Sequence, residues 1–413
     1  DTVRLVLDNA KITNSTGAAI NVVSTAEAII YTAAGTTNTV ADEANYTATG
    51  DDDPDAAIYS TANLTLTGEG SLSVKGAYEE GIHTTGGLVI ASGTLEVNAA
   101  NTGIKGKDYV DITGGIVNVT AAQDGIKSTN TDDESMGFTR LSAGSVTVSA
   151  GDDGLKAPHT LEISGGTLNI EKSNEGIEAQ YINILDGDVT VNSTDDGINA
   201  SLKDSSSDTS SDTTSGTATT GQQTQQNQNG QVQQAPAGGG TAPGGSQGSP
   251  GQNQNMPQPP TDGTMPGGGG GTFEVVDAAI NISGGTVTVN GPTAGGNNAL
   301  DSNGDLLLNG GTVTTGSTAD MFEAPSSAST SGYLKITDSS ALTQGSTVQV
   351  TDSSGTVVAN YKITTSGVQL VLVSNKNIVK GQSYTVSVTS GSVDAASTTA
   401  ASGTSELGSF TAA

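Results

Sequence analysis

A short block of residues recurs at a nearly fixed interval along the first half of the chain. Each copy has a polar or acidic residue, a glycine, an aliphatic residue and a polar residue, as in AQDGIKS at 122–128 and GDDGLKA at 151–157. The glycines of successive copies, from Gly81 to Gly197, are 22, 22, 29, 22 and 21 residues apart. A period of about 20–50 residues is typical of chains built from stacked repeats, in which each repeat covers the apolar face of its neighbour.

Within each repeat, apolar and polar residues alternate, as in LEISGGTLNI at 161–170. This period of two, broken by Gly-Gly turns, predicts short β-strands, and the many glycines and β-branched residues disfavour helices. A unit of this length with three short strands matches one coil of a parallel β-helix, whereas a propeller blade needs about 40 residues. We therefore predict an all-β parallel β-helix, with an antiparallel sandwich as the alternative.

The repeat divides the chain into four parts. Residues 1–201 carry the N-terminal coils, and the pattern resumes for the last coils over 273–330. The segment 202–272 is rich in Gln, Gly, Pro and Ser and has too few apolar residues to pack, so we interpret it as a loop inserted between coils. From 331 to 413, alternating segments continue without the repeat interval, which predicts a small C-terminal β domain or cap.

The chain is strongly acidic, with 43 Asp and Glu against 14 Lys and Arg and a net charge of −29. Such a surface repels nucleic acids and anionic membranes, so we expect neither as a partner. No apolar run approaches the about 18 residues of a membrane-spanning helix. The chain has no Cys, and its two histidines, His83 and His159, have no triad-like surroundings. A beginning in strand-like sequence fits an exported protein whose signal has been removed.

Stacked coils would place equivalent residues in columns about 4.8 Å apart. The inward column is aliphatic and consists of Ile82, Ile104, Ile126, Leu155, Ile177 and Ile198. The columns on either side of it hold carboxylates and lysines, and like charges at this distance repel by roughly 1 kcal/mol per pair in water. Solvation, the neighbouring lysines or bound cations would offset this repulsion.

A lysine follows the aliphatic residue only in the middle coils, so only there can lysines offset the repulsion between carboxylates. At the later coils, the position after the aliphatic residue is acidic or neutral, and there the charge balance favours Ca²⁺, which takes several carboxylate and carbonyl oxygens. We therefore predict calcium as a cofactor, and a solvated acidic edge is the alternative. The candidate ligands are Asp124, Asp152, Asp153, Glu175, Glu178, Asp195 and Asp196. Asp132 and Asp133, in the turn 128–136, form a second candidate, for which an exposed polar loop is an equally good account.

Several segments together resemble one bacterial family. They are VRLVLDNAKITNSTGAAINV (3–22), NTGIKGKDYVDITGGIVNV (101–119), QDGIKSTNTDDESMGF (123–138), DDGINAS (195–201) and VTVNGPTAGGNNALDSNGDLLLNGGTVTTGS (287–317). Their order over about residues 1–330 resembles the cellulose- and pectin-binding carbohydrate-binding-domain family of clostridial-type bacteria. The resemblance implies a right-handed parallel β-helix related in fold to polysaccharide lyases. It also implies bound calcium, binding of cellulose and pectic polymers, and an extracellular or cell-surface location.

The sequence departs from this family in two respects. Its insertion is rich in Gln and Asn rather than in Met and Gly, and aromatic residues are few, at 3% of the chain. The leading hypothesis is a non-catalytic, calcium-stabilised protein that binds extracellular polysaccharide. Its candidate carbohydrate-binding residues are Lys105, Lys107, Lys127, Lys156 and Tyr109. The lysines, or bridging calcium, would offset the repulsion between an acidic protein and an acidic polymer.

Two other functions remain open. In a calcium-dependent polysaccharide lyase, Lys127 or Lys156 would act as the base beside calcium-ligating aspartates. In a surface filament, subunits would assemble end to end, because a β-solenoid has open strand edges at both ends.

Overall fold

The computed structural model describes residues 1–47, 50, 53–201, 277–340, 342–390, 393, 397–401 and 403–413. These residues form an all-β structure of 31 strands. Among them there is no helix of the length and apolarity needed to span a membrane. The loop predicted at 202–272 lies outside the described residues.

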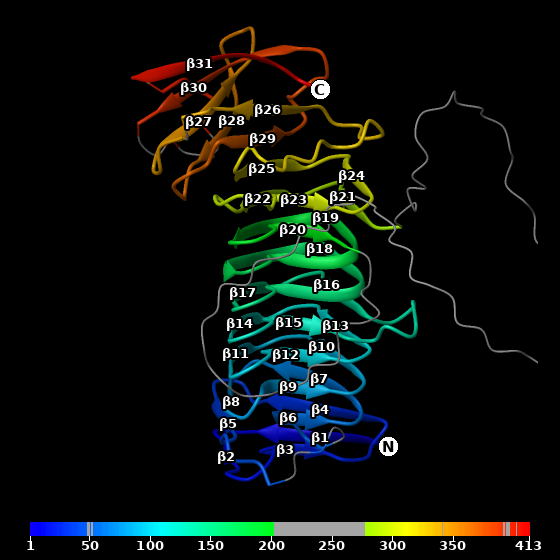
Figure 1. Cartoon of the computed structure of the whole chain (residues 1–413). Helices are drawn as coiled ribbons and strands as arrows, with labels where there is room; N and C mark the ends of the chain where they lie inside the picture. Colours follow the sequence, from blue (N-terminus) through cyan, green and yellow to red (C-terminus); the bar gives the residue numbers. More distant parts are fainter. Residues whose placement is uncertain are drawn as a thin grey trace, which may run out of the picture. The chain divides into compact units, whose positions relative to one another are not determined.

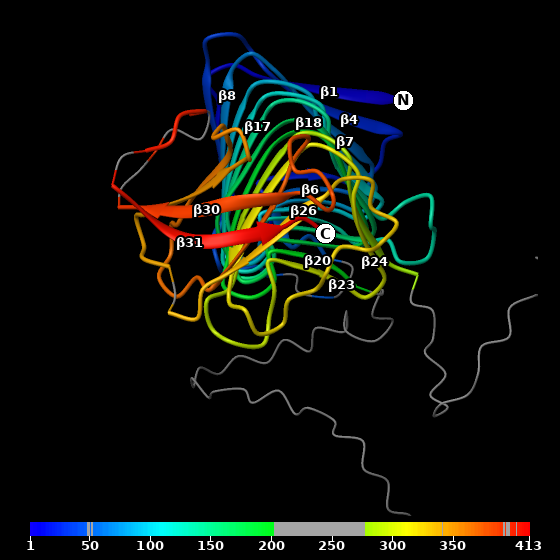
Figure 2. The ribbon, with the colours of Figure 1, turned by 90° about the horizontal axis from the view of Figure 1, so that it is seen from above.

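The chain winds into a β-solenoid of about nine turns, which confirms the predicted parallel β-helix (Figure 1). Each turn, or coil, contributes one short strand to each of three parallel sheets. Viewed along the solenoid axis, the coils lie over one another (Figure 2). The strands β18 (Leu155–Ser173) and β19 (Ile177–Ser193) continue round the corners and take part in all three sheets.

Apart from β18 and β19, each sheet consists of one short strand from each coil. The first sheet contains β1 (Thr2–Leu7), β4 (Glu27–Thr32), β7 (Asn63–Gly68), β10 (Gly87–Ile90), β13 (Tyr109–Ile112), β16 (Phe138–Leu141), β21 (Ala279–Ile282) and β24 (Asp305–Leu308). The second contains β2 (Lys11–Thr13), β5 (Thr37–Ala41), β8 (Ser71–Gly76), β11 (Thr94–Ala99), β14 (Ile116–Ala121), β17 (Ser145–Ser149), β22 (Thr286–Asn290) and β25 (Thr312–Ser317). The third contains β3 (Ile20–Val22), β6 (Ala56–Ser60), β9 (Glu80–Thr84), β12 (Ile104–Gly106), β15 (Ile126–Ser128), β20 (Ile198–Ala200) and β23 (Leu300–Ser302).

The aliphatic column of the repeated block lies inside the solenoid, as predicted. Its six members pair in register from coil to coil and are almost completely buried. Burying one such side chain stabilises the fold by about 1.5–3 kcal/mol, so the repeat supplies most of its own core. The alternation of buried and exposed residues along each strand then turns the polar residues of the block outward.

The glycine of the repeated block is required by close packing between coils. A Cβ atom on Gly125 would lie 2.3 Å from Cγ1 of Val148 and 2.6 Å from the carbonyl oxygen of Gly154 in the next coil. Gly103 has the same surroundings one coil earlier, against Val119 and Gly125. Neither position has room for a side chain, which explains why the block keeps a glycine beside its most polar residues.

The two ends of the solenoid differ. Within the described residues, β1 pairs only with β4, and its Val3 and Val6 are 51% and 55% exposed. At the other end, β29 (Leu370–Ser374) runs antiparallel to both β25 and β26 (Tyr333–Thr337). The prediction of open strand edges therefore fails for one strand of the C-terminal end, where β29 pairs with β25 as a cap would. Within the described residues, β23 and β24 of the same coil pair only with the coil before them.

The remaining strands form a separate antiparallel sheet with its own buried cluster. Its order is β28 (Val357–Lys362), β27 (Thr347–Thr351), β30 (Ser383–Thr389) and β31 (Thr404–Thr411). The buried cluster includes Val348, Val386 and Tyr384. Antiparallel strands joined by turns are what the alternating pattern of 331–413 predicts.

Candidate functional site

The outer side of the third sheet carries the polar residues of the repeated block. The column that follows the inward aliphatic residue consists of His83, Lys105, Lys127, Lys156, Glu178, Asn199 and Asp301. We call Lys105, Lys127 and Lys156 the lysine ladder. The column therefore changes along the solenoid axis from basic to acidic. Because coils of similar length return the chain to the same place, the alignment on glycine predicted this register.

The column that precedes the glycine is mostly acidic, and its members are buried or half-buried. It consists of Glu80, Thr102, Asp124, Asp153, Glu175, Asp196 and Asn298. From Thr102 onward, the backbone carbonyl of each accepts a hydrogen bond from the N–H of the glycine in the preceding coil. The side chains of Asp124 and Asp153 are only 8% and 3% exposed. A carboxylate at such depth destabilises the fold unless a partner compensates its charge.

The lysine ladder supplies these partners. Lys127 Nζ lies 2.8 Å from a carboxylate oxygen of Asp124, and Lys156 Nζ lies 2.7 Å from Asp153 and 2.5 Å from Glu178. In the first two pairs the lysine reaches back to the carboxylate three residues earlier in its own strand segment. The third pair joins two coils.

The charges in this part of the third sheet do not cancel, since three carboxylates share two lysines. Burial opposes ionisation of Asp124, but the charge and hydrogen bond of Lys127 lower its pKa. Burial raises the pKa of Asp153 to about 8, and the charges of Asp124 and Glu178 add to this effect against the attraction of Lys156. Burial alone would lower the pKa of Lys156, but the charges of Asp153 and Glu178 raise it.

Further along the axis, carboxylates gather without lysines. We call this cluster the acidic end; it consists of Glu175, Glu178, Asp195, Asp196, Asp301 and Glu323. Apart from the contact between Lys156 and Glu178, no ion pair reaches it in the described part of the chain. Instead, Asn199 Nδ2 donates to Glu175 at 3.3 Å, and backbone N–H groups of Asn298 and Ser302 donate to Asp196 and Glu323 at 2.6 Å.

Burial dominates the ionisation of the acidic end. It raises the pKa of Glu175 to about 7 and that of Asp196 to about 6, and neighbouring carboxylates strengthen both shifts. It also raises the pKa of Glu323 to about 7 and that of Asp301. A cation bound here would replace these protons, because carboxylates that cannot all be charged together attract either protons or metal.

Three groups of carboxylates lie close enough to share a cation, with one oxygen of each residue within 4.8 Å of the others. The groups are Asp124–Asp152–Asp153, Asp153–Glu175–Glu178 and Asp55–Glu79–Glu80. The first two bring together five of the predicted calcium ligands. An all-oxygen donor set on neighbouring coils suits a hard cation such as Ca²⁺.

The other predicted ligands lie elsewhere. Asp195 and Asp196 are one coil beyond these groups, in the acidic end. Asp132 and Asp133 are exposed in the turn before β16. The Asp133 carboxylate accepts hydrogen bonds from the backbone N–H and the hydroxyl of Ser135, which lower its pKa. These contacts close the turn on itself and match the exposed-loop alternative.

The group around Asp55 was missed by sequence reasoning. Asp55 Oδ1 lies 2.5 Å from His83 Nδ1, and its other oxygen lies 3.7 Å from Lys105 Nζ. Glu80 is 3% exposed, its Oε2 has no hydrogen-bond partner among the described residues, and burial raises its pKa to about 8. Asp55 stands at the end of a long segment between β5 and β6. Because this segment does not follow the repeat interval, the sequence does not show that Asp55 lies beside Glu79 and Glu80. Asp301 and Glu323 were missed because the repeat is degenerate there.

The predicted carbohydrate-binding residues lie in three places. The lysine ladder faces outward from the third sheet, with 20–41% of each side chain exposed. Lys107 is exposed in the turn after β12, outside the column. Tyr109 belongs to β13 in the first sheet, so the fold separates it from the lysines.

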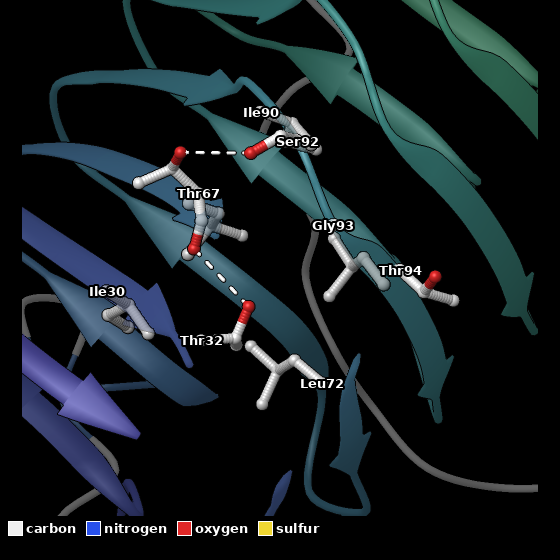
Figure 3. A pocket seen from close by; sticks show the side chains of 10 residues that line it. Ile30, Thr32, Thr67, Leu72, Ile90, Ser92, Gly93 and Thr94 are labelled. Atoms are coloured by element: carbon white, nitrogen blue, oxygen red, sulfur yellow. Dashed lines mark hydrogen bonds between the residues drawn. The ribbon is translucent and has the colours of Figure 1, made fainter. Parts of the chain in front are cut away.

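The cavity drawn in Figure 3 lies at the corner between the first and second sheets. Five of its ten lining residues are aliphatic and four carry hydroxyls, and the hydroxyls of Thr67 and Ser92 form a hydrogen bond of 3.1 Å. Its volume of about 10 Å³ is near the least that holds one water. It is too small for a sugar, so the outer faces of the coils are the candidate binding surfaces.

A solenoid built from stacked coils of similar length belongs to the class of repeat proteins, in which each coil contacts only its neighbours. The chain belongs to the family described as carbohydrate-binding domain-containing protein, whose family model matches residues 1–223, more than half of the chain.

The chain is also similar to two other proteins. A carbohydrate-binding domain-containing protein from Acetivibrio thermocellus is 36% identical over 97 residues, which are 23% of this chain and 34% of that relative. The chain thus matches about a third of the relative's length. A polysaccharide lyase-like protein from C. thermocellum, solved as a gadolinium derivative, is 31% identical with a TM-score of 0.40, covering 46% of this chain and 77% of that one.

Proposed function

We propose that this protein is a non-catalytic, calcium-stabilised extracellular protein that binds pectic or cellulosic polysaccharides. The observation that carries the proposal is the outer side of the third sheet, where the lysine ladder lies beside buried carboxylates and is followed along the solenoid axis by further acidic residues. A polyuronate chain lying along this track would meet cationic side chains and, with calcium bound, cationic metal. Family membership supports a carbohydrate as the ligand.

Calcium has a structural role in this proposal. Asp124, Asp152 and Asp153 would hold one ion, and Asp153, Glu175 and Glu178 would offer the oxygens for another. The buried carboxylates of these groups fit a cation because the lysines leave part of their negative charge uncompensated. Bound calcium supplies positive charge that both relieves repulsion between coils and attracts the carboxylates of a uronate polymer.

The state of the lysines supports binding over catalysis. A lyase base must be neutral near the working pH, which requires a lowered lysine pKa. Neighbouring carboxylates instead raise the pKa of Lys105 and of Lys156 above the ordinary value, although burial acts in the opposite direction. Lys127 is held 2.8 Å from Asp124 in the same kind of pair. The raised pKa values keep Lys105 and Lys156 charged, which suits the recognition of anions.

The deciding experiment uses purified protein and polygalacturonate, with calcium or with EDTA. We expect retention on the polymer in calcium, loss of retention in EDTA, and no ultraviolet absorbance from unsaturated products. Formation of unsaturated products would overturn the non-catalytic assignment. Retention that is the same in EDTA would overturn the role of calcium.

End-to-end assembly is a second candidate, favoured by the open edge of β1. This edge has no strand partner in the described residues, and exposed Val3 and Val6 border it. An unpaired, apolar edge strand is a template for pairing with another chain. We expect a second copy of the chain as its partner. Light scattering as a function of concentration tests this, and particles that stay monomeric at every concentration would exclude it.

A further inference from the structure

Two aromatic rings lie in parallel on the outer side of the first sheet. Tyr109 in β13 and Phe138 in β16 pair in register, their ring centroids are 5.0 Å apart, and their planes differ by 3°. Val110 and Ile112 are buried in the core, so strand alternation turns Tyr109 outward. These rings belong to a different sheet from the lysine ladder.

A glycine accommodates the first of these rings. Gly87 of β10 pairs in register with Tyr109, and a Cβ atom on Gly87 would lie 2.1 Å from Cζ of the tyrosine. The ring therefore leans over the glycine backbone, in space that any side chain at this position would occupy. The missing side chain lets Tyr109 lie against the sheet instead of standing away from it.

A polar pair borders the rings. Arg140, two residues after Phe138, donates from Nε to Asp111 at 3.0 Å and from its terminal nitrogen to the other carboxylate oxygen. Its guanidinium carbon lies 5.6 Å from the centroid of Phe138. A bidentate pair of this kind holds donors and acceptors in fixed positions beside an apolar surface.

The solenoid core does not account for these rings. Aromatic residues are only 3% of the chain, and the fully buried members of the solenoid cluster within the described residues are all aliphatic. Sugar rings offer flat C–H faces edged by hydroxyls, and sites that bind them combine aromatic surface with a few fixed polar groups. Tyr109, Phe138 and the Arg140–Asp111 pair provide this combination.

The charges nearby favour an uncharged ligand. Asp108 precedes Tyr109, and Glu162 pairs in register with Arg140 on the next coil. Together with Asp111 they give three carboxylates against one guanidinium, and that guanidinium is already paired. A polyuronate would be repelled here, whereas a neutral chain would not.

We propose that Tyr109, held against Gly87, forms with Phe138 and the Arg140–Asp111 pair a binding surface for an uncharged polysaccharide chain with flat pyranose faces. This inference rests on the proposed function in that both assign a polysaccharide ligand. It deepens that proposal by assigning the neutral polymer to a second face, on another sheet than the lysine ladder. The chain then has one face for an acidic polymer and one for a neutral polymer.

The test measures retention of the full chain on insoluble β-1,4-glucan and on polygalacturonate with calcium. Variant Y109L/F138L keeps apolar volume but removes both rings, and Gly87→Ala keeps both rings but displaces Tyr109. We expect the double variant to lose about tenfold or more in glucan affinity and the glycine variant to lose several-fold, with polygalacturonate retention unchanged in both. Variant D124N/K127Q removes both partners of one ladder pair and leaves neither charge without its partner. It is the reciprocal control and should lose only polygalacturonate retention. Circular dichroism and melting temperature confirm that each variant is folded.

The outcomes separate the two proposals. Failure of the wild-type protein to bind either polymer would overturn the proposed function. Wild-type binding to polygalacturonate alone would overturn the neutral face and leave the proposed function standing. Glucan binding that is unchanged in folded Y109L/F138L would also overturn the neutral face, because the rings would then serve only to stabilise the sheet.

Discussion

The lysine ladder and the acidic end occupy the same columns of the same sheet, yet they are held together differently. In the ladder, Lys127 and Lys156 sit within 2.8 Å of buried carboxylates. In the acidic end, the Glu175 carboxylate accepts a hydrogen bond from the side-chain amide of Asn199, and that of Asp196 accepts one from the backbone N–H of Asn298. The backbone register is the same in both regions, so the difference lies in the residue that follows the inward aliphatic position.

This comparison shows that the fold tolerates buried carboxylates without specifying how they are neutralised. A lysine on the same coil is one solution, and a proton or a cation is another. The first is built into the chain, whereas the second depends on pH and on calcium. The acidic end is therefore where solution conditions should act on stability.

The largest expected effect comes from removing a ladder lysine. Lys127→Met leaves Asp124 buried without its partner and should lower the free energy of unfolding by about 3 kcal/mol in urea denaturation, as for other broken buried pairs. Lys107→Met, at an exposed position outside the column, is the matched control and should change stability by no more than about 0.5 kcal/mol. A loss below about 1 kcal/mol in the first variant would mean that solvent, not lysine, compensates Asp124.

Calcium should stabilise the protein through the acidic groups. At a calcium concentration of about 100 times Kd, one site adds about 2.7 kcal/mol, visible as a rise in Tm at pH 8. Variant E175Q should lose a large part of this rise, because Glu175 is one of the three carboxylates in its group. The control D132N/D133N should keep it all, and loss of the rise in that variant would place the ion in the turn instead.

The pH dependence should follow from the raised pKa values. In the folded state the pKa is about 7 for Glu175 and Glu323 and about 6 for Asp196, against ordinary values of 4.5 and 3.8. At a pH between the ordinary pKa and the raised pKa, the folded chain holds protons that the unfolded chain has released. The free energy of unfolding therefore falls as pH rises from 5 to 8. We expect Tm in EDTA to be lower at pH 8 than at pH 5, and the gain from calcium to grow over the same range. A Tm in EDTA that rises towards pH 8 would contradict the buried state of these carboxylates.

The smallest effect concerns single amide substitutions in EDTA at pH 8. Glu175→Gln removes an uncompensated charge and should stabilise by about 1 kcal/mol, less than the full pKa shift implies because the side chain is only half-buried and partly screened. Asp124→Asn should destabilise, because it removes the partner of Lys127. If both variants changed the free energy of unfolding in the same direction, the two regions would not differ in how their carboxylates are neutralised.

Much of the fold could be predicted from the sequence because the repeat fixes both strand period and coil length. Aligning the block on its glycines predicted the inward column and the columns beside it, since coils of 21 or 22 residues return to the same register. The longer interval before Gly154 did not disturb this, because the extra residues form an exposed turn before β16.

The remaining features depend on contacts that spacing does not encode. The partner of each lysine follows from side-chain direction, and Lys156 reaches both its own coil and the next. The pairing of Asp55 with His83 crosses a coil whose length differs from the others. Tyr109 was predicted as a binding residue, but its stacking on Phe138 was not. The two residues stand on either side of the irregular repeat interval, so only the structure shows that they are neighbours.

The close packing of the block glycines has a consequence for how such a chain can change over time. Because Gly103 and Gly125 each fit against the next coil in the same way, a duplicated coil would fit its neighbours without new contacts being invented. Each duplication of about 22 codons would lengthen the charged track by one rung of about 4.8 Å. Under the proposed function, evolution could therefore change the length of polymer that the protein binds, in steps of one whole coil.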